Sequence, residues 1–262
     1  QQAGELRRGE LLGGDDHDRD VAGGRVSPKG VEHLEAAQAR HDQVEGQHLG
    51  RALAIIIDLT EGELGTRGTR AIRAREAREA AKILGCVREN AGLPDGNIEI
   101  SIPNRLQLIR LYRKYRPKIL LIPHFAERHP DHVRAHHLSR EAWFYAGLRK
   151  IESEENGVKQ KPWRPRNYFH FMQWQEFEPS FAVDISDVYE LRLKAIKAHK
   201  SQLHDPGSKD PQTILSQKEF LEMLEARARY YGYRIGTRYA EPFYSVELIG
   251  IGDVFGLQLF KG

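Results

Sequence analysis

Two histidines three residues apart, His129 and His132, have the residue type and spacing in this chain that best suit chemistry. They belong to the run Arg128-His129-Pro130-Asp131-His132. Residues three apart lie on one face of a helix, so the two imidazoles are expected to lie close together. A neutral imidazole is a natural zinc ligand, and a second one can transfer a proton or stabilise an oxyanion. Two surface histidines at a helix start are the plainer alternative, because short histidine motifs are common.

The elements around this run place it at the mouth of a helix. The apolar run Ile119 to Pro123 precedes it and predicts a buried parallel strand. Residues 132–148 predict a helix, and Pro130 suits its first turn, where the missing N–H costs nothing. Open α/β sheets bind ligands at the carboxyl ends of their strands, so the two histidines are expected at a binding edge.

The composition excludes several classes of function. The 262 residues are 40% hydrophobic and 29% charged, which is ordinary for a globular protein. With 40 basic and 37 acidic side chains the net charge is +3, which gives no general electrostatic reason to bind nucleic acid or an anionic membrane. No apolar stretch approaches the roughly 18 residues that cross a bilayer. A single cysteine, Cys86, excludes an intrachain disulfide and a cysteine-rich zinc site, and we expect a cytoplasmic protein.

Residues 1–50 differ in character from residues 51–262. They contain no Phe, Tyr, Trp, Ile or Met, and the run from Asp15 to Asp20 is charged without a period. We expect this segment to be disordered, loosely docked or wrongly assigned to the protein, and residues 51–262 to form the folded domain. A solvated charge run explains Asp15 to Asp20 better than a metal cluster, because nothing nearby would hold the side chains rigid.

The folded part predicts alternating strands and helices, which implies a parallel sheet with right-handed crossovers. After the third helix we expect a polar loop, two strands, two long helices and a mixed tail. The expected strands are 53–57, 97–102, 119–123, 167–173 and 180–185, and the expected helices are 70–84, 104–115, 132–148, 186–203 and 216–231.

A glycine-rich loop lies between the first strand and the first helix. Gly62, Gly65 and Gly68 surround Arg67, so the loop could present backbone N–H groups and one guanidinium to a polar ligand. It is neither a Walker loop nor a clean dinucleotide fingerprint. A tight turn that needs glycine explains it equally well.

Taken together, five motifs in order resemble the LmbE-like (PIG-L) zinc deacetylases. Within that family they are similar to the branch that deacetylates N-acetylglucosaminyl malate during bacillithiol synthesis. The resemblance covers about Ala54 to Phe243. The motifs are Asp58 to Thr69, Gly92 to Gly96, Arg128 to His132, Ala198 to Gln202 and Tyr239 to Phe243.

The resemblance implies an α/β, Rossmann-like three-layer fold with a mainly parallel central sheet and helices on both faces. It implies hydrolysis of an N-acetyl group from a glucosamine conjugate, with one Zn2+ held by two histidines and one aspartate. His132 matches a metal ligand, and His129 matches the catalytic histidine that steadies or protonates the tetrahedral intermediate. Arg67 matches a substrate-binding arginine.

The resemblance also implies roles for three further residues. Asp131 is expected to orient a histidine ring, and Arg128 to contact substrate or hold the loop. His199 is expected at the rim of the site, although a half-exposed helix histidine is an equal alternative. The expected partner is a small amino-sugar conjugate, without nucleic acid or membrane, and the family often forms homo-oligomers, including hexamers.

The chain departs from the family at its beginning. The family's His-Pro-Asp-Asp motif, which supplies the other two zinc ligands and the base, is absent here. Either the first fifty residues are wrong for the protein, through a frameshift or a misassigned start, or the protein has diverged and lost its metal site. In the second case we expect a non-catalytic sugar-binding or assembly subunit, because His132 alone cannot hold zinc tightly.

Overall fold

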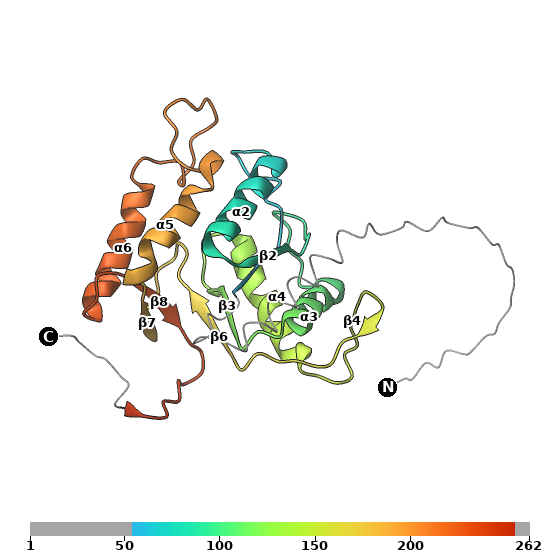
Figure 1. The fold of residues 1–262 in the computed structure, drawn as a ribbon. Helices are drawn as coiled ribbons and strands as arrows, with labels where there is room; N and C mark the ends of the chain where they lie inside the picture. Colours follow the sequence, from blue (N-terminus) through green and yellow to red (C-terminus); the bar gives the residue numbers. More distant parts are fainter. Residues whose placement is uncertain (1–53, 255–262) are drawn as a thin grey trace, which may run out of the picture. The chain divides into compact units, whose positions relative to one another are not determined.

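The structure is a computed structural model that describes residues 54–254 (Figure 1). The expectations for residues 1–50, and the predicted start of the first strand at Leu53, lie outside these residues. No helix in the described part is long and apolar enough to cross a membrane.

The first half of the described chain alternates strands and helices, as the sequence predicts. Strand β1 pairs in parallel with β2, from Ile55 beside Val87 to Asp58 beside Asn90. The elements are β1 (Ile55–Asp58), α2 (Arg70–Leu84), β2 (Val87–Asn90), α3 (Ile102–Tyr115), β3 (Ile119–Pro123) and α4 (Pro130–Ala146).

The predicted strand at 97–102 is wrong, and the second strand is β2 instead. Helix α2 ends at Gly85, whose left-handed backbone (φ 65°) lets the chain turn directly into β2. The segment after Asn97 does not pair, because Ser101 caps α3 by accepting the N–H of Asn104 and the helix begins at Ile102. Ile98 is nevertheless buried, so its apolar side chain serves the core and not a strand.

The second half contributes three strands to a four-stranded sheet that shares no strand with the β1–β2 pair. Strand β3 pairs in parallel with β6, which pairs antiparallel with β8, and β8 pairs antiparallel with β7. The mixed α/β class is confirmed, and parallel pairing holds for β1–β2 and β3–β6. The remaining elements here are β6 (Asn167–Phe171), β7 (Phe181–Asp184), α5 (Tyr189–Lys197), α6 (Phe220–Arg234) and β8 (Ala240–Tyr244).

Two local expectations in this half need correction. The predicted helix 186–203 is continuous only over α5, with 3-10 turns at Ser186–Val188 and Lys200–Gln202. After Lys197 the N–H groups of Ala198 and His199 donate to carbonyls three residues earlier, and the N–H of Ser201 donates to Glu76 at 2.7 Å. The polar loop after α4 contains a small hairpin of β4 (Glu154–Glu155) and β5 (Val158–Lys159), turned by two residues with positive φ.

The main core lies between the α3–α4 pair and the strands. Leu108, Ile109, Leu138 and Ala142 are almost completely buried there. Helix α2 packs against α5, and α6 packs against β8. Burial of these apolar faces fixes the strand ends, from which the loops that carry the candidate site emerge.

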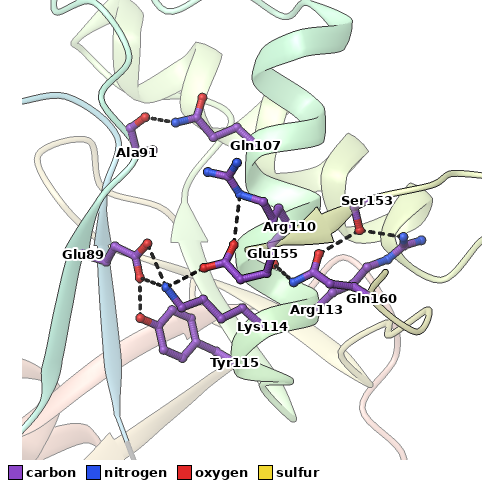
Figure 2. Close-up of polar contacts among 10 residues, drawn as sticks. All are labelled: Glu89, Ala91, Gln107, Arg110, Arg113, Lys114, Tyr115, Ser153, Glu155 and Gln160. Carbon is purple, nitrogen blue, oxygen red and sulfur yellow. Dashed lines mark hydrogen bonds and ion pairs between the residues drawn. The ribbon is translucent and has the colours of Figure 1, made fainter. Parts of the chain in front are cut away.

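A polar network ties α3 to its neighbours (Figure 2). Glu89 of β2 accepts from Lys114 at 2.9 Å and from the hydroxyl of Tyr115, and Lys114 also pairs with Glu155 of the hairpin at 3.2 Å. Burial raises the pKa of Tyr115 to about 12. Buried Arg113 donates to the carbonyls that follow α4, so this network holds the far end of that helix.

Candidate functional site

His129 caps the N-terminus of α4 with its side chain. Its Nδ1 accepts the N–H of Asp131 at 3.1 Å, so the neutral ring carries its proton on Nε2. The residue is exposed, and its ring centroid lies 5.0 Å from that of His132. The predicted convergence of these two imidazoles is therefore present, with an N–H of His129 free to donate to a ligand.

His132 is half-buried and has an unsatisfied nitrogen. Its Nδ1 is buried and has no hydrogen-bond partner among residues 54–254. Burial lowers the pKa of His132, and the neighbouring His129 lowers it further. A neutral imidazole with an unused nitrogen is the state that a zinc ligand requires.

The fit to a complete zinc site is only partial. Within residues 54–254 no three His, Cys, Asp or Glu side chains are grouped so that they could hold a metal ion. His132 therefore fits as one ligand, and the described residues do not fit the three-ligand site that a catalytic zinc ion needs.

Asp131 is buried between the helix and a loop. Its carboxylate accepts the N–H of Gly96 at 2.7 Å and that of Ile98 at 3.4 Å, and Arg134 lies 3.8 Å away. These bonds fix the 96–98 loop to the mouth of α4. The orientation of a histidine ring by Asp131 stays a prediction.

The loop before His129 meets the segment after β6. Because β3 and β6 are parallel and Pro123 pairs with Phe171, both segments leave the same edge of the sheet. The Glu127 carboxylate accepts the N–H of Trp174 at 2.9 Å, and the Arg128 guanidinium carbon lies 5.1 Å from the centre of the Trp174 ring. Sequence reasoning missed both Glu127 and Trp174. The signal was available, since Trp174 directly follows the predicted strand 167–173.

Arg67 lies against the backbone of the 201–211 segment. It is buried, and its guanidinium donates to the carbonyls of Ser201 at 3.1 Å, Leu203 at 3.4 Å and Pro211 at 3.5 Å. No contact found among residues 54–254 joins it to His129. The structure thus shows Arg67 as a clamp on the 201–211 segment, and its substrate contact stays a prediction.

His199 belongs to a polar group next to the end of β1. Asp58, the last residue of β1, accepts two bonds from Arg88 at 2.6 and 2.8 Å. Burial lowers the pKa of His199, and nearby Arg88 lowers it further. Nδ1 of His199 lies 3.5 Å from Nε2 of Gln202. The effect of Arg88 on this pKa indicates that His199 lies near the Arg88–Asp58 pair, and its place at the substrate rim stays a prediction.

A second histidine cluster, not predicted from the sequence, lies inside the fold. His136 of α4 and His170 of β6 are 4% and 0% exposed, and Nε2 of His170 lies 3.2 Å from Nδ1 of His136. Nδ1 of His170 donates to the Tyr244 carbonyl, and Nδ1 of His136 lies 3.2 Å from the Pro123 carbonyl. Burial is the main cause that lowers the pKa of each ring to about 4. Both rings are therefore neutral, and they join α4 to β3, β6 and β8.

Comparisons with known sequences agree with the motif pattern. The family described as PIG-L, GlcNAc-PI de-N-acetylase, matches residues 47–143. The diacetylchitobiose deacetylase of Thermococcus kodakarensis is 32% identical over 191 residues, which make up 70% of this chain. The chain spans 65% of the length of that enzyme.

Solved structures share the fold. The conserved protein TT1542 of Thermus thermophilus is 33% identical with a TM-score of 0.66, over 82% of this chain and 89% of that one. The inhibitor-bound N,N'-diacetylchitobiose deacetylase of Pyrococcus horikoshii is 28% identical with a TM-score of 0.59, over 73% and 72%. GalB, a 4-carboxy-2-hydroxymuconate hydratase of Pseudomonas putida, is 21% identical with a TM-score of 0.62, over 87% and 92%, and indicates the fold alone.

Proposed function

Because the chain belongs to the PIG-L family, we propose that it hydrolyses the N-acetyl group of an N-acetylglucosamine conjugate. The observation that carries the proposal is the pair of His129 and His132 at the mouth of α4, with one exposed N–H donor and one unpaired ring nitrogen. The two relatives named as diacetylchitobiose deacetylases support an N-acetylated glucosamine unit as the reacting part of the substrate.

His129 has the proton placement that amide hydrolysis needs. Water adds to the acetyl carbon, the C–N bond breaks, and acetate and a free amine leave. An Nε2–H donor stabilises the oxygen of the amide as it becomes an oxyanion, an effect worth about 10²–10³ in rate. Protonation turns Nδ1 into a donor and ends its bond to the N–H of Asp131, and the resulting imidazolium can give its Nε2 proton to the leaving nitrogen. The Nδ1 bond to Asp131 keeps Nε2 directed to the reaction and not to the helix.

We also propose zinc as the cofactor, with His132 as one of its ligands and the other ligands supplied from outside residues 54–254. Bound zinc lowers the pKa of a water ligand toward neutrality and polarises a carbonyl, which is the chemistry that deacetylation requires. The unpaired, neutral ring of His132 supports this assignment. The motif pattern further supports N-acetylglucosaminyl malate as the substrate, with exposed Arg128 able to bind a malate carboxylate, and a homo-oligomeric assembly.

A second candidate function is a sugar-binding or assembly subunit without turnover. Two predicted site residues favour this function because their polar groups hold loops. Arg67 donates to three backbone carbonyls, and Asp131 accepts from two backbone N–H groups. Such a subunit would bind the same sugar through Arg128 and release no acetate.

Acetate release and metal content separate the two candidates. The purified full-length protein is incubated with zinc and with N-acetylglucosaminyl malate or N,N'-diacetylchitobiose. We expect acetate from at least one of them and about one zinc per chain by elemental analysis. Sugar binding without acetate and without zinc would favour the binding subunit, and no binding and no turnover would reject both.

A further inference from the structure

Trp174 is a large aromatic side chain left partly open to solvent beside the candidate site. It is 39% exposed, although it sits in a loop held firmly by backbone hydrogen bonds. The other two tryptophans are half-buried, and their ring N–H groups donate to the carbonyls of Pro165 and Pro117 at 2.9 Å. A guanidinium lies over each of those two rings as well, from Arg164 and Arg116, so Trp174 differs in its exposure beside the candidate site and not in having a cation on its ring.

That cation is the guanidinium of Arg128, one residue before His129. Its central carbon lies 5.1 Å from the centre of the Trp174 ring, within the range of a cation–π contact. Both side chains are exposed, so the pair is a weak contact that a ligand can displace. An indole face offers an apolar surface, and a guanidinium beside it offers hydrogen-bond donors for hydroxyl or carboxylate oxygens.

Glu127 fixes this pair relative to the histidines. Its carboxylate accepts the backbone N–H groups of Arg128 at 2.7 Å, Trp174 at 2.9 Å and Gln175 at 3.1 Å. One carboxylate thus joins the loop that carries His129 to the loop that carries Trp174. Burial acts to raise the pKa of Glu127, but the three N–H groups hold it below its usual value, so the carboxylate stays charged and keeps these bonds.

We propose that Trp174 and Arg128 form one wall of the amino-sugar subsite, and that Glu127 is the positioning residue that holds this wall next to His129. The inference rests on the proposed function, because it names the part of the protein that selects the sugar. The apolar C–H face of a pyranose ring stacks on the indole, and the Arg128 guanidinium turns from the indole to an oxygen of the sugar or of its aglycone.

The first test compares substitutions at Trp174. We expect Trp174→Ala to raise KM for N,N'-diacetylchitobiose about tenfold, with little change in kcat, because stacking binds the ring and does not act on the amide. Trp174→Phe keeps an aromatic face and should restore most of the affinity. Tyr233→Ala is the matched control, because Tyr233 is an exposed aromatic (74%) on α6, and its KM should equal that of the wild type.

The second test measures the positioning role of Glu127. Glu127→Gln has a single acceptor oxygen for three N–H groups, so we expect a KM several times higher at nearly constant kcat. The Glu127→Gln, Trp174→Ala double variant should raise KM by less than the product of the two single effects, because the carboxylate acts in part through the indole. Independent, multiplying effects would overturn the positioning role.

Calorimetric binding of the same disaccharide distinguishes failure of this inference from failure of the proposed function. If the wild type binds the disaccharide without hydrolysing it, the subsite is tested through Kd in place of KM. We then expect Trp174→Ala to raise Kd about tenfold. An unchanged KM or Kd in Trp174→Ala overturns the subsite alone. A wild type that neither binds nor hydrolyses the sugar overturns both proposals.

Discussion

Two pairs of histidines in this chain have the same ring geometry and opposite surroundings. In the pair His129–His132 and in the pair His136–His170 the ring centroids are 5.0 Å apart and the planes meet at 31°. The first pair has an exposed N–H donor and an unpaired nitrogen, whereas the second is buried and its nitrogens contact one another and backbone carbonyls. The distance between two rings therefore does not distinguish a reactive histidine pair from a structural one. Solvent access and unused hydrogen-bonding capacity do.

The largest expected effect comes from replacing the donor of the exposed pair. His129→Ala should lower kcat by about 10²–10⁴ because it removes the oxyanion donor and the general acid. Ala also removes the helix cap, so His129→Asn, which keeps a side-chain acceptor for the cap, is the matched variant and should show a similar loss of kcat. Steady-state acetate release measures kcat of the two variants, and thermal melts measure their stability. A His129→Asn variant with wild-type kcat would remove His129 from the reaction.

The buried pair should control stability in acid. The pKa of each ring is lowered from 6.5 to about 4, so the unfolded chain binds more protons between these values. The free energy of unfolding should be level above pH 6.5 and fall by about 2 kcal/mol per ring as the pH drops toward 4, after allowance for relaxation of the site.

Urea titrations between pH 7.5 and 4.5 measure this slope. His136→Gln, which cannot titrate, should remove one ring's share and so roughly halve the slope, and His129→Asn should leave it unchanged. An equal slope in wild type and His136→Gln would show that the acid sensitivity lies elsewhere.

A smaller effect distinguishes a clamp from a substrate contact at Arg67. Lys cannot reproduce the fork that reaches three carbonyls, so Arg67→Lys should lower the free energy of unfolding by about 1–2 kcal/mol. KM should change little. A higher KM with an unchanged melting temperature would instead support the substrate role implied by the family resemblance.

The order of elements in the first half could be predicted because each carries its own local signal. Helix α2 has an apolar side, Thr69 as its cap and Gly85 as its end, and all of these agree. The strand β2 was missed because Val87–Asn90 is short and polar, and its identity depends on pairing with β1. The break after α5 was missed because no proline or glycine marks it, and the partner of Ser201 beyond the break is Glu76, 125 residues away in the sequence.

The candidate site was predictable to the extent that it is local. His129 and His132 share one helical turn, so their spacing alone brings them together. Trp174 comes beside Arg128 and Glu127 only through the parallel pairing of β3 with β6, which no local signal in the sequence specifies. Arg67 illustrates the opposite case, because a motif match indicated a substrate contact while the fold gives the guanidinium three carbonyl partners.

The most direct test of the account compares one residue from each histidine pair. Acetate release from the N-acetylglucosamine conjugate is measured for His132→Gln and His136→Gln at pH 7.5, with circular dichroism to show that both are folded. The account predicts that His132→Gln loses nearly all activity and that His136→Gln retains it. Full activity in His132→Gln, or an equal loss in a folded His136→Gln, would contradict the assignment of the reaction to the mouth of α4.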